Sequence, residues 1–206
     1  MSSILDSVRQ QLDANTIQTI SQQLGADPAT TSNAISMALP ALVGGLSRNA
    51  SSPQGAAALD AALNDHDGSI LDNLGGLLGG GGGTGAGSAL GGLGGGIGGA
   101  ILGHIFGAKR GSVEAGVGKA SGLDAARTAQ LLAMLAPIVM GVLGRMKRQK
   151  GIDANQLPDV LNAGRQQGEK EVPGLGGLLD ANNDGQITDD LLRMGGTALG
   201  GLFGKK

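Results

Sequence analysis

The stretch GGLLGGGGGTGAGSALGGLGGGIGGAILGHIFG, residues 75–107, divides the chain into two parts. It contains no charged residue, since none occurs between Asp72 and Lys109. Glycine recurs every four residues in its second half, at Gly91, Gly95, Gly99, Gly103 and Gly107. Residues four apart are neighbours on a helix, so this spacing predicts a helix over 89–107 with a bare stripe that another backbone can approach. We expect residues 75–88 to form a flexible linker, because interior glycine costs a helix about 0.5–1 kcal/mol relative to alanine.

Composition limits the class of protein. The 206 residues include 41 glycines but no Cys, Trp or Tyr. Disulfides, thiol catalysis and cysteine metal sites are therefore excluded. Phe106 and Phe203 are the two aromatic residues, so the core must be built from aliphatic side chains, which favours helices. The near absence of aromatic side chains for stacking on bases argues against nucleic-acid binding.

Charge is unevenly distributed along the chain. Residues 1–98 have two basic and seven acidic side chains, a net charge of −5, and residues 99–206 have thirteen basic and ten acidic ones, a net charge of +3. Opposite charges on the two halves favour docking between copies of the chain. The N-terminal sequence MSSILDSVRQQLDANT lacks a basic start followed by an apolar run, so no secretory signal is expected and a cytoplasmic location is predicted.

Apolar residues at helical spacing predict several helices before the glycine-rich stretch. A pair of amphipathic helices is expected over 3–24. Asp27 and Pro28 form an N-cap followed by proline in the first turn, which begins a helix that continues to about residue 48. Pro40 lies inside this helix and is expected to kink it. A loop is expected over 49–55 and a short helix over 56–63. An acidic turn over 64–68 and a last helical segment over 70–78 follow.

The same plan recurs after an offset of 97 residues. Residues 24–48 align without a gap at this offset, so that Asp27 corresponds to Asp124 and Pro40 to Pro137. Other matching pairs are Met37 with Met134, Gly44 with Gly141, Leu46 with Leu143 and Arg48 with Arg145. The sequence therefore predicts an all-α protein made of two related helical units by internal duplication. The predicted divisions are a first repeat over 1–80, a glycine-rich linker with the start of the striped helix over 81–98, and a second repeat over 99–206.

Three stretches carry a resemblance to a known family: ILGHIFG (101–107), SGLDAARTAQLLAMLAPIVMGVLG (121–144) and LLDANNDGQITDDLLRMGG (178–196). On these residues the chain resembles the bacterial domain-of-unknown-function family 937, which is related to the YidB-like proteins. The stretches cover most of the second repeat, and the first repeat matches more loosely. The resemblance implies a small all-helical bacterial protein and no established activity.

A calcium-loop pattern occurs in DANNDGQI, residues 180–187. Oxygen-bearing side chains stand at positions one, three and five, and glycine stands at position six, where the loop turns sharply. Position twelve, normally a bidentate Glu, is Leu191, so Asp189 or Asp190, one or two residues earlier, must complete the coordination. The alternative is a helix start with Thr188 as its N-cap. The candidate ligands of a weakly bound Ca²⁺, the one cofactor considered and not a required one, are Asp180, Asn182, Asp184, Gln186, Asp189 and Asp190.

Residues 128–144, TAQLLAMLAPIVMGVLG, contain no charge and are flanked by basic residues. A membrane-spanning helix needs about 20 apolar residues and often has basic flanks. This segment is shorter and includes Gln130 and Pro137. We interpret it as a buried central helix with a membrane span as the alternative.

No pattern in the sequence indicates catalysis. His66 and His104 lie in different segments, and neither has a nucleophile at a recognisable spacing. The glycine-rich stretch lacks the G-K-[ST] ending of a phosphate-binding loop. We therefore predict a non-enzymatic structural or interaction module that forms a homo-oligomer through its Gly/Ala/Leu-rich helices. The alternative is a membrane-associated helical protein that uses 89–107 and 128–144.

Overall fold

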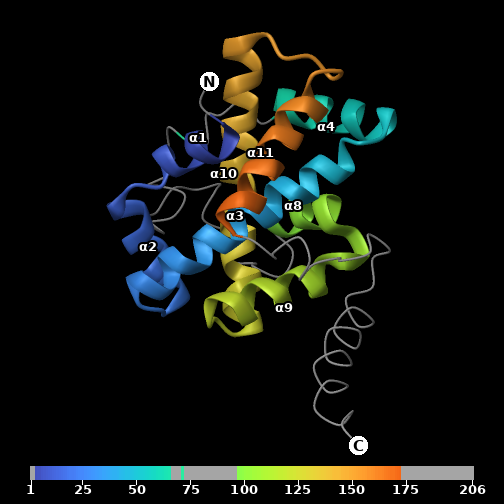
Figure 1. Ribbon diagram of the computed structural model, residues 1–206. Coiled ribbons are helices and arrows are strands. Elements are labelled where there is room, and N and C mark those ends of the chain that lie inside the picture. The colour runs from blue at the N-terminus through green and yellow to red at the C-terminus, as the bar shows by residue number, and fades with distance from the viewer. Residues whose placement is uncertain (1–2, 66–70, 72–96, 173–206) are drawn as a thin grey trace, which may run out of the picture.

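The computed structural model describes residues 3–65, 71 and 97–172 (Figure 1). Every regular element within these residues is a helix, which confirms the predicted all-α fold. The elements are α1 (Ile4–Gln11), α2 (Ala14–Leu24), α3 (Pro28–Asn49), α4 (Pro53–Asp65), α8 (Ile97–Phe106), the 3-10 turn η1 (Gly107–Lys109), α9 (Arg110–Ser121), α10 (Ala125–Lys150) and α11 (Leu157–Glu171).

Aspartate N-caps begin three of the helices. The carboxylates of Asp13, Asp27 and Asp124 accept hydrogen bonds from the backbone N–H three residues later, at 2.8, 2.9 and 2.9 Å. Each bond satisfies one N–H of the first helical turn that has no partner inside the helix. The predicted helix pair over 3–24 is confirmed as α1 and α2. The short helix predicted at 56–63 begins earlier, at Pro53, because proline is well suited to the first turn of a helix.

The long helices α3 and α10 form the centre of the molecule and cross each other there (Figure 1). α3 contacts α2, α8, α9, α10 and α11, and α10 contacts α1, α2, α4, α8 and α9 as well. Buried side chains from both halves of the described chain belong to a single hydrophobic core. The two predicted repeats therefore share one core.

α10 confirms the interpretation of 128–144 as a buried central helix. All residues from 131 to 144 are buried. By length and composition alone α10 could cross a membrane, but 83% of its most apolar 18-residue window is buried inside the protein. Its apolar surface is thus used by the other helices of the bundle.

Both long helices continue through a buried proline, Pro40 in α3 and Pro137 in α10. Proline has no N–H, so Pro137 leaves the carbonyl of Ala133 without its helical partner. Gly98, in the first turn of α8, lies against this carbonyl: a Cβ at residue 98 would stand 2.1 Å from the Ala133 oxygen. The close approach of α8 to α10 therefore requires glycine at this position.

Candidate interaction face

The predicted calcium ligands lie outside the described residues, so calcium binding remains a prediction for Asp180, Asn182, Asp184, Gln186, Asp189 and Asp190. Within residues 3–65, 71 and 97–172, no group of three or more acidic or histidine side chains is placed to hold a metal ion. His104 is exposed on α8, and His66 lies outside the described residues. The candidate site in the described part of the chain is instead an exposed face of α8 and α9.

The glycine-striped helix predicted over 89–107 is helical from Ile97 to Phe106, and residues 89–96 lie outside the described part of the chain. It ends at Phe106 because Gly107 has a positive φ of 52°, which breaks the helical path. Of the predicted stripe, Gly103 and Gly107 make no close packing contact within the described chain. A Cβ added at Gly103 would meet nothing within 4 Å, whereas the tight contact is made by Gly98.

The helices α8 and α9 are apolar on their inner side and nearly bare on their outer side. Their inner side is buried in the core by Ile101, Leu102, Ile105, Phe106, Val113 and Val117. Their outer side exposes a row of glycine, alanine and serine residues that we call the small-residue face: Ala100, Gly103, Gly107, Ala108, Gly111, Ser112 and Ala115.

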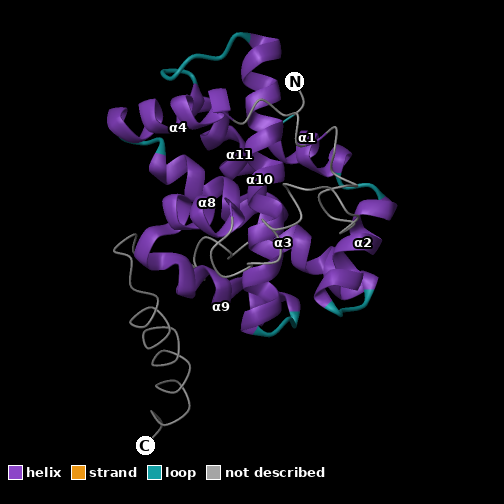
Figure 2. Ribbon diagram, turned by 180° about the vertical axis from the view of Figure 1, so that it is seen from behind, coloured by secondary structure: helices purple, strands orange, loops and turns teal. Residues whose placement is uncertain are grey.

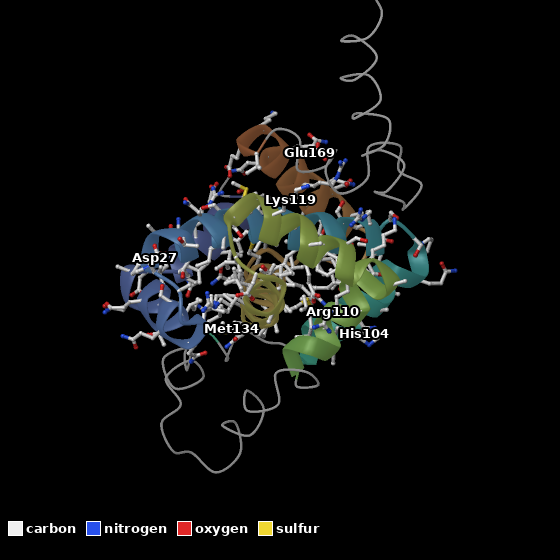
Figure 3. All side chains as sticks on the ribbon, turned by 90° about the horizontal axis from the view of Figure 1, so that it is seen from below. Asp27, His104, Arg110, Lys119, Met134 and Glu169 are labelled. Atoms are coloured by element: carbon white, nitrogen blue, oxygen red, sulfur yellow. The ribbon has the colours of Figure 1, made fainter. Side chains whose placement is uncertain are left out.

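The small-residue face extends from α8 through η1 into α9. Ala100 and Gly103 lie on α8, Gly107 and Ala108 lie in the turn, and Gly111, Ser112 and Ala115 lie on α9, where residues three or four apart share one side of the helix. Added Cβ atoms at Gly103, Gly107 and Gly111 would all meet nothing within 4 Å. The face is therefore open to solvent, and its largest side chain is a serine. Among the exposed residues of α8 and α9, His104 and Lys119 have the large side chains, and Arg110, also labelled in Figure 3, is half-buried.

Contacts on both sides of the junction hold α8 and α9 in place. The Nδ2 of Asn49 in α3 donates a hydrogen bond to the backbone carbonyl of His104 at 2.9 Å, so it satisfies a carbonyl in the last turn of α8. Arg110 Nε lies 2.6 Å from Glu114 Oε1, and Arg110 Nη1 lies 3.5 Å from the Gly99 carbonyl oxygen. The guanidinium thus links α9 back to α8 and balances the charge of Glu114.

The sequence matches a family described as "Bacterial protein of unknown function (DUF937)" over residues 6–146. The chain belongs to the DUF937 family. The matched region begins in α1 and ends in α10, so it includes the first repeat, on which the resemblance had been looser, and stops before 178–196. The small-residue face lies inside it. No curated protein and no solved structure matches the chain.

The DUF937 chain also has a half-buried polar clamp between α4 and α10. Lys147 Nζ lies 2.7 Å from Asp60 Oδ1, 2.8 Å from Asn64 Oδ1 and 3.1 Å from the Asp60 carbonyl oxygen. The ammonium group donates hydrogen bonds to Asn64 Oδ1 and to the Asp60 carbonyl oxygen, and it forms an ion pair with the Asp60 carboxylate. Lys147 therefore fastens α4 to α10.

A second polar network joins α1 to α11. Arg9 pairs with Glu171, and Gln167 Nε2 donates to Glu171 Oε1 at 2.9 Å and to Asp6 Oδ1 at 3.1 Å. The hydrogen bonds from Arg9 lower the pKa of Glu171. Hydrogen bonds from the Ser3 backbone N–H and from Gln167 lower the pKa of Asp6. Asp6, Arg9 and Gln167 are half-buried, Glu171 is exposed, and the network connects elements of the two halves of the chain.

Another close helix contact in the described part of the chain involves a glycine pair on α11 that the sequence pattern did not predict. Gly164 and Gly168 lie on the buried side of α11. A Cβ at 164 would stand 2.4 Å from Ile4 Cγ2 and 3.1 Å from Val43 Cγ1, and one at 168 would stand 2.7 Å from Pro40 Cβ. Gly164 and Gly168 are four residues apart in the sequence, but polar residues surround them and no apolar run marks this segment as a packing surface.

Proposed function

We propose that this protein is a non-enzymatic structural module that self-associates, with the small-residue face of one copy packed on the same face of a second copy. The observation that carries the proposal is Gly103, an exposed glycine inside a helix. Glycine costs a helix interior about 0.8–1.0 kcal/mol relative to alanine. Since a Cβ at this position would meet nothing within 4 Å, the fold of the single chain gives no reason for that cost.

Packing between two such faces has a clear physical basis. Glycine and alanine let helix backbones approach closely, which increases dispersion contacts and allows Cα–H···O contacts between helices. Burying these residues also costs almost no side-chain entropy, whereas lysine or glutamate would lose up to about 2 kcal/mol each. A loss of stability kept for the sake of an interaction is the usual compromise at functional surfaces.

The test compares Gly103→Leu with Ala163→Leu by light scattering over a range of protein concentrations. Ala163 is exposed on α11, away from the small-residue face, so it serves as the matched control. We expect the wild type and the control to assemble alike, and Gly103→Leu to need at least a tenfold higher concentration. At concentrations where all three are monomeric, Gly103→Leu is expected to be more stable than the wild type, because leucine is the better helix former. A strictly monomeric wild type contradicts the proposal.

We infer in addition that the two halves are related by duplication. The helix boundaries support this with the offset found in the sequence: α2 ends at Leu24 and α9 at Ser121, and α3 begins at Pro28 and α10 at Ala125. Gly25 and Gly122, which end α2 and α9, both have a positive φ, 60° and 82°. Asp27 and Asp124 are the N-caps that follow them. The glycine-rich linker proposed between the units lies outside the described residues.

Membrane association through α10 is the second candidate function. Its support is the length and apolar composition of that helix. Insertion requires α10 to leave the core, because most of its apolar window is already buried by other helices. Fractionation of cells tests this candidate together with the predicted cytoplasmic location. Protein that remains with membranes after an alkaline wash favours insertion, and release by that wash argues against it.

A further inference from the structure

We draw no further inference here: the strongest candidate, the surface patch of exposed alanines Ala57, Ala58 and Ala61 on α4, at the edge of the bundle (Figure 2), is a row of small residues, and nothing in the described part of the chain shows what covers it.

Discussion

At the scale of single residues, glycine has three distinct uses in this chain. Gly98 and Gly164 permit backbone or side-chain contacts that a Cβ would obstruct. Gly107 and Gly122 adopt positive φ where one helix gives way to the next element. Gly103 makes no close contact and has no positive φ, so neither use explains it. This difference from the other glycines is the reason for proposing an interaction outside the single chain.

The first prediction compares two substitutions that add the same single methyl group. Gly164→Ala is expected to lower the free energy of unfolding by about 1–3 kcal/mol, because its Cβ would stand 2.4 Å from the buried Ile4 side chain. Gly103→Ala is expected to raise it by about 0.8–1.0 kcal/mol, because alanine is the better helix former and the position is open. Urea unfolding of both monomeric variants measures the difference. Equal effects of the same sign would refute the assignment of these two glycines.

The second prediction concerns acid stability. Hydrogen bonds from Arg9 lower the pKa of Glu171 in the folded state, and hydrogen bonds from Ser3 and Gln167 lower that of Asp6. A lowered folded-state pKa stabilises the fold at pH values above the unfolded pKa, which is near 4, and this stabilisation is lost as the pH falls through the folded pKa. The urea midpoint is therefore expected to decrease below about pH 4, and to decrease less in Glu171→Gln. An unchanged acid slope in that variant contradicts the role of Glu171.

At the scale of helices, local signals in the sequence were sufficient to predict much of the fold. The N-cap at Asp27 and the proline after it located the start of α3, and the uncharged run 128–144 located the buried part of α10. These signals act within a few residues, so they can be read from a single sequence. The packing of α11 on α3 could not be predicted, because the periodicity of a helix shows which side is buried but not which helix covers it.

The third prediction tests the central position of α10. Met134 is 1% exposed, so Met134→Asp places a carboxylate in the core without a partner. Such a burial costs several kcal/mol, or forces the carboxyl group to take up a proton. The exposed Gln149→Asp in the same helix is the control and is expected to change stability by less than about 1 kcal/mol. Thermal unfolding followed by circular dichroism distinguishes the two, and comparable losses would show that Met134 does not lie in the core.

At the scale of the whole molecule, helices from both halves of the described chain share one core, and α8 and α9 expose a nearly bare face. The sequence indicated the importance of glycine, and the predicted stripe from Gly91 to Gly107 lies only partly within the described residues. Within the single chain Gly103 of this stripe receives no other helix, and close contacts are made by glycines outside the stripe, among them Gly98, Gly164 and Gly168. The predicted calcium ligands lie outside the described residues.

The most direct test of self-association is amide hydrogen exchange measured at low and at high protein concentration. Exchange rates report how well each backbone N–H is protected from solvent, one segment at a time. If the small-residue face is the site of association, amides of residues 100–115 will exchange more slowly at high concentration, and those of α11 will not change. Exchange in 100–115 that is the same at both concentrations, while the protein is shown by its mass to be assembled, would contradict the proposed face.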